Sequence, residues 1–346
     1  MSRKSLFAGA VLLTGFFMAS HVHAYKYTAC GGVKVVWSNP FGMTQNTYSI
    51  KVGSQREVAV DKAIARWRNV IGMEDMVYMS SSVNSGTKIA QYNYHSDVAV
   101  VPAGSLGPGR AGLTMMIHDG CFFGGDMEWI EADVVAESDL DFGEVDEVDL
   151  STGSGRGTFL HEFGHAHGLD HVQKFNVMRT GLPVPHIGGP GENLDVLPDD
   201  ARGGRFLYPT GNAEVNLFAT PHRRTSADNI TTNNSGTVTF CKGGGGVLTI
   251  NATVGNNGTV DVKQTEHWWV STSKTAHSGG IKIGQWKNGT FLANTVHTRE
   301  LSFTMPALAP GTYFLYHGVD VLDEVDESVE GDNNTREALV IQVNNC

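Results

Sequence analysis

The spacing of apolar residues divides the chain into two unlike halves. In the first half, residues 55–71 repeat apolar side chains at helical spacing, which predicts an amphipathic helix with one buried face. Short apolar or alternating runs predict strands at residues 46–52, 76–80, 98–102, 112–118 and 129–135. Another helix is expected at about residues 154–168. In this order the elements predict an α+β domain at residues 25–210, with a twisted mixed sheet and long helices.

From residue 238 onward, the pattern is that of strands alone. Alternating runs predict strands at residues 247–254, 260–265, 267–271, 281–286, 300–305 and 312–320. The dipeptides Asn257-Gly258 and Asn288-Gly289 are turn signals between them. Short strands over this length indicate an all-β sandwich, which we place at residues 235–346. Residues 211–234 lose this periodicity and are rich in Thr, Asn and Ser, so we expect a linker there.

Residues 1–24 have the features of a secretory signal peptide. Arg3 and Lys4 precede an apolar run, and Val22-His23-Ala24 offers a small-residue cleavage site. No other stretch reaches about 18 consecutive apolar residues, so no membrane span is predicted. We therefore expect a secreted protein, and we expect it to be a monomer.

The composition is acidic. The chain has 25 Lys and Arg residues against 36 Asp and Glu residues, which gives a formal net charge of -11 at pH 7. Phosphate backbones and anionic lipids repel such a chain, so nucleic acid is not an expected partner. This charge favours neutral or basic proteins and peptides as partners.

One short stretch, from His161 to His171, combines metal ligands with a candidate general base. His161 and His165 stand four residues apart, so on a helix their imidazoles lie on one face and can bind one cation. Glu162 follows the first ligand, where its carboxylate can take a proton from water at the metal. Gly168 can adopt the positive φ that ends a helix, which would bring His171 back as a third ligand. Three protein ligands and one position left for water are typical of catalytic zinc.

The motif H-E-x-x-H-x-x-G-x-x-H, with Met178 after it, resembles the metzincin zinc endopeptidases. The order of elements from Val33 to Pro209 is similar to the matrixin family of that clan. So is the closing segment from Leu197 to Tyr208, whose Asp199 and Asp200 we expect to stabilise the start of a helix.

The resemblance implies a peptidase mechanism and assigns roles to the residues of the motif. His161, His165 and His171 would hold one catalytic zinc ion, and Glu162 would be the general base for the attacking water. Met178 would be a structural Met-turn residue beneath the metal. A strand near residues 112–116 would bind the substrate in extended form. Thr180 stands where astacins and serralysins have a tyrosine ligand, so no fourth protein ligand is expected.

The second half resembles the cell-adhesion-related (CARDB) domain of bacterial surface proteins. The resemblance rests on Gly255–Thr259, Leu308–Tyr313 and Glu327–Asn334, and it spans about residues 247–343. It implies a domain related to the immunoglobulin and fibronectin type III sandwiches. The role it suggests is targeting or adhesion, with a surface or matrix ligand as partner.

Four cysteines in an exported chain predict disulfide bonds. Cys30 and Cys121 fall in the first half, and Cys241 and Cys346 fall in the second, so pairing within each half is the simplest arrangement. The matrixin resemblance suggests another role for Cys30, which could ligate the zinc and keep the enzyme latent. Only about six residues separate Cys30 from the expected cleavage site, too few for a globular prodomain, so we favour the disulfide.

The acidic stretch at residues 126–147 contains no Lys or Arg. Its clustered carboxylates suggest calcium as a second cofactor, since calcium takes oxygen ligands. A solvated acidic face explains the same composition, and the sequence leaves both interpretations open.

A second function also fits the sequence. The chain could be a secreted adhesion or surface-binding protein in which the zinc domain is not catalytic. A structural zinc usually has a fourth protein ligand. The motif supplies three ligands together with Glu162, which favours the secreted zinc endopeptidase.

Overall fold

A computed structural model of the chain describes residues 26–30, 33–37, 43–46, 50–51, 53–71, 78–83, 96–118, 127–143, 154–172, 177–179, 196–209, 214–224, 230–327 and 333–346. The expected signal peptide at residues 1–24 lies outside these residues. Within them, no helix is both long enough and apolar enough to cross a bilayer.

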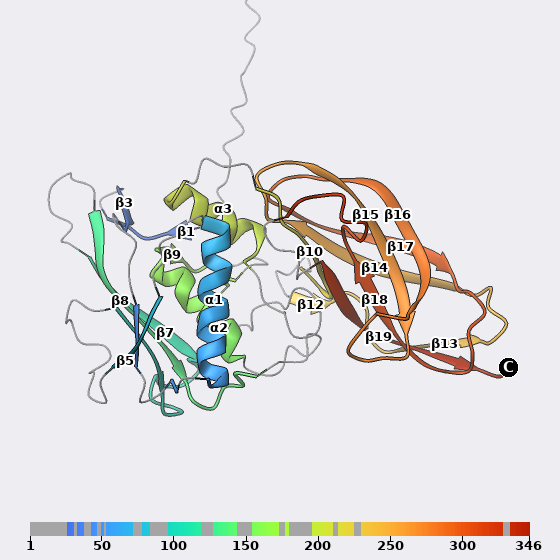
Figure 1. The fold of residues 1–346 in the computed structure, drawn as a ribbon, viewed down its shortest axis with the longest axis horizontal. Helices are drawn as coiled ribbons and strands as arrows, with labels where there is room; N and C mark the ends of the chain where they lie inside the picture. Colours follow the sequence, from blue (N-terminus) through green and yellow to red (C-terminus); the bar gives the residue numbers. More distant parts are fainter. Residues whose placement is uncertain are drawn as a thin grey trace, which may run out of the picture.

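A mixed β-sheet forms one side of the first half (Figure 1). Its strands follow the order β2 (Ala29–Cys30), β3 (Val33–Val36), β8 (Met127–Glu137), β6 (Ser96–Val101), β4 (Met43–Asn46) and β5 (Tyr78–Val83). A further strand, β7 (Gly112–His118), pairs antiparallel with β8, whereas β3 and β6 run parallel to it. The strand expected at residues 46–52 is wrong, since β4 ends at Asn46 and Ile50 lies in a bend.

Helix α1 (Gln55–Ile71) covers the sheet with an apolar face. It begins at a capping arrangement, because the Glu57 amide donates to Ser54 Oγ at 3.3 Å and the Glu57 carboxylate accepts from the Gly53 amide at 2.5 Å. Trp67 Nε1 donates to the Leu160 carbonyl at 2.8 Å, which ties α1 to the next helix. The buried face of α1 consists of Ala59, Val60, Ala63, Ile64 and Trp67.

Helix α2 (Gly155–Ala166) starts and stops at residues suited to those positions. Ser154 is the N-cap, and its side chain accepts from the Gly157 amide at 3.1 Å. The helix ends just before Gly168, whose φ of +98° suits glycine best. Strand β9 (Leu169–Asp170) follows at once and pairs with β1 (Lys26–Tyr27).

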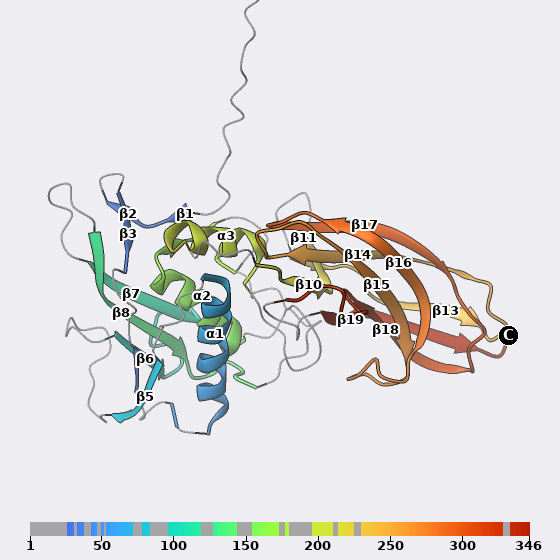
Figure 2. The ribbon, with the colours of Figure 1, turned by 45° about the horizontal axis from the view of Figure 1, so that its top comes forward.

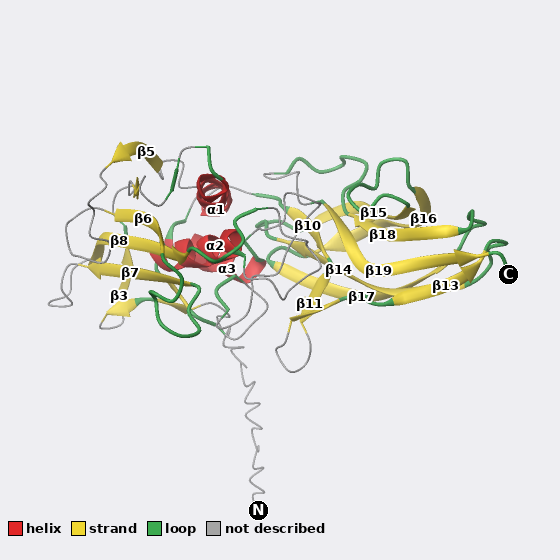
Figure 3. Cartoon of the chain, turned by 90° about the horizontal axis from the view of Figure 1, so that it is seen from below, coloured by secondary structure: helices red, strands yellow, loops and turns green. Residues whose placement is uncertain are grey.

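Helix α3 (Pro198–Leu207) closes the first half and lies at the junction with the second half (Figure 2). Pro198 occupies a first-turn position, where its missing N–H costs no helical hydrogen bond. The N-cap residue is Leu197, and Asp199 and Asp200 lie in the first turn, at the start of the helix as expected. The three helices lie as a layer between the mixed sheet and the strands of the second half (Figure 3).

The second half is a β-sandwich. One sheet has the order β10 (Leu217–Thr220), β14 (Val247–Asn256) and β17 (Thr295–Thr304). The other has the order β13 (Thr237–Cys241), β19 (Asn334–Asn344), β18 (Gly311–Gly318), β15 (Val262–Ser271) and β16 (Ile281–Phe291). Leu248 and Ile250 of β14 share an apolar core with Trp268, Val270 and Ile341 of the second sheet.

The expected fold class is wrong for the chain as a whole. We expected an α+β metzincin-type domain with long helices, followed by a sandwich. The described residues contain nineteen strands and three helices, and these helices have 17, 12 and 10 residues. The chain is therefore predominantly β and sandwich-like. The three helices lie close to the ranges expected for them, so the class was wrong because strands predominate in the chain, not because helices are missing.

The segment expected as a linker also differs from the prediction. Residues 211–234 include β10, β11 (His222–Arg224) and β12 (Ile230–Thr232). β10 pairs with β14 and β11 pairs with β12, both antiparallel. Polar residues of this segment stabilise its structure, because the buried Asn233 side chain donates from Nδ2 to the Thr220 carbonyl at 2.9 Å. β10 is thus part of the sandwich.

The disulfide between Cys241 and Cys346 forms as predicted and joins the end of β13 to the last residue of the chain. The two cysteines are 105 residues apart in sequence, so the bond closes a loop that contains most of the sandwich. Cys121 and the side chain of Cys30 lie outside the described part of the chain, and their pairing stays a prediction.

Replacing both Cys241 and Cys346 by Ser is expected to lower the free energy of unfolding of the sandwich by about 4 kcal/mol. The reason is that a cross-link closing roughly 100 residues restricts the unfolded chain by about that amount. Urea unfolding followed by tryptophan fluorescence measures the change, since Trp268 is fully buried in this core. A decrease below about 1 kcal/mol would contradict the prediction.

Candidate metal centre

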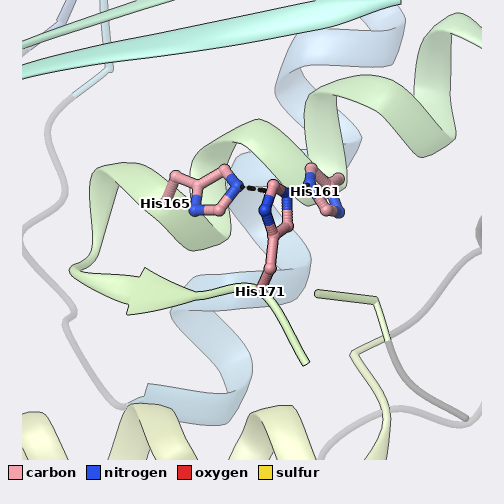
Figure 4. A group of neighbouring side chains, drawn as sticks. All are labelled: His161, His165 and His171. Carbon is pink, nitrogen blue, oxygen red and sulfur yellow. Dashed lines mark hydrogen bonds between the residues drawn. The ribbon is translucent and has the colours of Figure 1, made fainter. Parts of the chain in front are cut away.

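Three histidine side chains converge at the end of helix α2 (Figure 4). His161 and His165 lie on one face of α2, and His171 returns to them after β9. The Nε2 atom of His171 lies 3.0 Å from Nε2 of His161 and 3.1 Å from Nε2 of His165. The ligand atoms of the three histidines all lie within 4.8 Å of one another, close enough to hold one metal ion. Among the described residues, no other group of His, Cys, Asp or Glu side chains is arranged in this way.

Backbone carbonyls fix the tautomers of two of these histidines. Nδ1 of His161 lies 2.6 Å from the Val177 carbonyl, and Nδ1 of His165 lies 2.8 Å from the Leu169 carbonyl. A carbonyl can only accept, so each Nδ1 carries the proton and each neutral ring has a lone pair at Nε2. The lone pairs therefore point to the place where the three rings meet, which is the arrangement that a metal ion requires.

The environment keeps these imidazoles neutral. Burial, together with neighbouring His165, lowers the pKa of His161 to about 3. Burial lowers the pKa of His165 to about 4, although its bond to the Leu169 carbonyl acts in the opposite direction. Neutral imidazole is the form that binds metals. His171 is exposed, so the site opens to solvent on that side.

Met178 lies directly beneath helix α2 at Gly164. A Cβ atom at Gly164 would lie 2.2 Å from Met178 Sδ and 2.8 Å from Trp67 Cζ2, so only glycine fits between these side chains. Met178 is 1% exposed, and its carbonyl accepts from the Val172 amide at 2.9 Å. Met178 is thereby held against the underside of α2, and its carbonyl is bonded to Val172, the residue after His171.

Asp200 of α3 supports this region in a way that the sequence did not reveal. Its fully buried carboxylate accepts from the Val177 amide at 2.5 Å and from the Met178 amide at 3.3 Å. Burial raises the pKa of this carboxyl well above its usual range, against the effect of these amide bonds. The Val177 peptide thus connects Asp200 on one side to His161 Nδ1 on the other. The paired aspartates were a signal, but we interpreted them only as residues that stabilise the start of a helix.

Glu162 is buried beside the ligands and contacts strand β7. Its Oε2 lies 2.7 Å from Thr114 Oγ1, which also lies 2.8 Å from the Glu162 carbonyl. Burial raises the pKa of Glu162 to about 7, and the bond to Thr114 counteracts part of this rise. Thr114 was not singled out from the sequence, because its approach to Glu162 depends on how β7 packs against α2.

The acidic stretch at residues 126–147 is only in part a solvated face where it is described, since Asp139 and Asp141 are exposed. Glu131, Asp133 and Glu137 are buried on β8. Asp133 Oδ1 accepts from the Asp97 amide at 3.0 Å, and Glu137 Oε1 accepts from the Leu106 amide at 3.1 Å. These carboxylates hold loops and strands together, and calcium binding stays a prediction.

Comparisons with known proteins find similarities among solved structures alone. No protein-family model and no curated protein matches the chain. Among solved structures, the CARDB domain of a Pyrococcus furiosus protein in complex with di-metal ions is 15% identical. The aligned region covers 38% of this chain and 92% of the CARDB chain, with a TM-score of 0.24. The solution structure of that CARDB domain is 16% identical, with coverages of 39% and 97% and a TM-score of 0.25.

A polysaccharide monooxygenase is also similar, with 11% identity, coverages of 32% and 60% and a TM-score of 0.20. These similarities concern the fold alone and do not bear on function. The resemblance to metzincins rests on the sequence motif.

Replacing His161 or His171 by Ala is expected to reduce the bound metal from one ion per chain to none at micromolar protein. Each change removes one of three converging Nε2 donors and leaves an incomplete set. Metal content after dialysis, measured by atomic emission, tests this. His297→Ala is the matched control, because His297 is exposed on the sandwich. A variant lacking His171 that keeps a full equivalent of metal would contradict the site.

Replacing Gly164 by Ala is expected to lower the free energy of unfolding by about 1–2 kcal/mol. The new methyl group would overlap Met178 Sδ, a cost of about 1–3 kcal/mol that exceeds the gain of up to about 1 kcal/mol in helix propensity. Thermal and urea unfolding measure the balance. Gly243→Ala is the control, since a Cβ there meets nothing within 4 Å. Equal stability of the two variants would contradict the close contact beneath α2.

Proposed function

We propose that the protein is a secreted zinc endopeptidase. The observation that carries the proposal is the convergence of His161, His165 and His171 Nε2 atoms beside buried Glu162. A set of metal ligands next to a carboxylate is one arrangement that can hydrolyse an unactivated amide.

The donor set fits zinc. Two imidazoles that bind zinc at about 2.0–2.1 Å with tetrahedral angles have their nitrogens about 3.3 Å apart. The distances of 3.0 and 3.1 Å are close to this value. Three neutral nitrogen donors suit zinc better than calcium or magnesium, which prefer oxygen. Bound here, zinc would polarise the scissile carbonyl and lower the pKa of water.

Glu162 is the residue that moves the proton in this proposal. A carboxyl whose pKa lies near 7 can accept a proton from water and release it to the departing amine nitrogen at neutral pH. Thr114 Oγ1 holds one carboxylate oxygen, Oε2, so the other oxygen, Oε1, is available for the proton. The sheet and α2 together therefore orient the base.

Strand β7 is the proposed site for the substrate backbone. Among the described strands, β7 pairs with β8 alone, and Thr114 places it against Glu162. A peptide in extended form could add to the other edge of β7 through backbone hydrogen bonds. This arrangement requires no particular side chain of the substrate, which suits an endopeptidase acting on unfolded protein segments.

The exposure of the site favours catalysis over a structural metal. A structural zinc is usually closed by four protein ligands. Here the cluster in the described residues has three, and His171 is exposed to solvent. The alternative, an adhesion protein with a non-catalytic metal domain, gives no reason for a buried carboxylate beside the ligands.

Replacing Glu162 by Gln is expected to leave metal binding intact and to lower the hydrolysis rate by about 10²–10⁴-fold. The amide keeps the shape of the side chain but cannot accept the proton from water. Cleavage of an unfolded protein by the chain from residue 25 onward, with metal content measured in parallel, tests this.

Glu300→Gln is the control for this experiment, because Glu300 is exposed on β17. Undiminished cleavage by the Glu162 variant would exclude Glu162 as the base. No cleavage by the unmodified chain at one zinc per molecule would favour the adhesion protein.

A further inference from the structure

The sandwich holds helix α3 through one arginine. Arg205, in the last turn of α3, donates from Nε and Nη2 to Glu214 Oε2 at 3.0 and 2.7 Å. Its Nη1 donates to the Asn257 carbonyl at 2.7 Å and lies 3.3 Å from Asn294 Oδ1. These three partners come from the segment before β10, the turn after β14 and the turn before β17. One guanidinium thus connects α3 to three separate parts of the second half.

Hydrogen bonds hold the turn after β14, which contacts α3, in one conformation. Glu214 N donates to Thr259 Oγ1 at 2.9 Å, and Thr259 N donates back to the Glu214 carbonyl at 2.8 Å. Asn257 is fully buried, and its Nδ2 donates to the carbonyl of Val196, two residues before α3 begins. The Asn257-Gly258 dipeptide is therefore the part of the sandwich that reaches into the first half.

The contact is strong for a charged pair. The Arg205 and Glu214 side chains are 12% and 14% exposed, so water screens them little. Two guanidinium nitrogens meet one carboxylate oxygen, and a third nitrogen binds a backbone carbonyl, so the planar group is held in one orientation. A lysine could supply the charge, but its three N–H donors share one nitrogen and cannot reproduce the planar arrangement of three donor nitrogens.

The opposite end of the same helix touches the metal centre. Asp200, in the first turn of α3, accepts from the Val177 and Met178 amides. The Val177 carbonyl in turn accepts from Nδ1 of His161. The ten-residue helix α3 is therefore bonded to the sandwich through Arg205 at its C-terminal end and through Val196 just before its start. At its N-terminal end, Asp200 binds the peptide that holds His161.

We propose that the sandwich positions the metal centre, in addition to any targeting role. Arg205 and Asn257 are positioning residues that fix α3, and α3 fixes Val177, Met178 and His161 through Asp200. This inference rests on the proposed metal site, but its structural part holds for the metal-free chain as well. It implies that the two halves are not independent modules.

The first experiment measures amide hydrogen exchange in the metal-free full chain. Arg205→Met is compared with Arg202→Met, since Arg202 is exposed on the same helix. The Val177 and Met178 amides should exchange severalfold faster in the Arg205 variant and at the original rate in the Arg202 variant. Equal rates in the two variants would overturn the proposal. If Arg205→Met does not fold, Arg205→Lys takes its place with the same criterion.

The second experiment measures release of zinc to a chelator from the full chain. Arg205→Met should release zinc about tenfold faster, the lower end of the effect of removing an outer support of a ligand. In an Asp200→Asn background the same change should add little, because the path through Asp200 is already weakened. An undiminished effect in that background would show that Arg205 acts by another route and would overturn the proposed path.

The two experiments separate this inference from the proposed function. If the chain does not bind zinc, the proposed endopeptidase function is excluded. The exchange experiment would still decide whether the sandwich positions Val177 and Met178 through Arg205. Normal zinc release together with normal exchange in the Arg205 variant would remove the coupling and leave the endopeptidase in place.

Discussion

The backbone at Gly168 is the constraint on which the candidate metal centre depends. Its φ of +98° is rarely accessible to residues with a side chain, and a Cβ there would lie 3.2 Å from both the Val35 carbonyl and Trp129 Nε1. The Gly168 amide donates to the His165 carbonyl, and the Gly168 carbonyl accepts from the Thr28 amide, both at 2.7 Å. The chain can therefore leave α2 abruptly, form β9 and return His171 to the other two imidazoles.

The parts of the site that could be predicted from the sequence are those set by local geometry. The separation of His161 and His165 fixes their shared face once a helix forms, and a glycine three residues later permits the sharp turn. The same holds for the Asn257-Gly258 turn and for most strands of the second half. The pairing of Cys241 with Cys346 could also be predicted from the sequence, since four cysteines allow only three pairings.

What the sequence did not reveal depends on contacts between distant segments. Thr114 reaches Glu162 across 48 residues, and Asp200 reaches Val177 across 23. Arg205 and Asn257 meet only because the sandwich packs against α3. Neither periodicity nor residue spacing carries this information. The expected linker failed for a related reason, because Leu217–Thr220 is a strand only through its pairing with β14. The fold class failed because several strands, such as β13 and β19, were not predicted, whereas the helices lie close to their expected ranges.

The disulfide at the end of the chain has a topological consequence. Because Cys346 is bonded to Cys241, the backbone from β13 to the C-terminus forms a covalent ring. A single cut in any loop between these residues leaves both fragments attached to each other. Force applied to the chain on either side of the two cysteines cannot stretch the ring, because the bridge carries the tension directly from Cys241 to Cys346. The second half of the protein therefore stays in one piece after a first cleavage between the two cysteines.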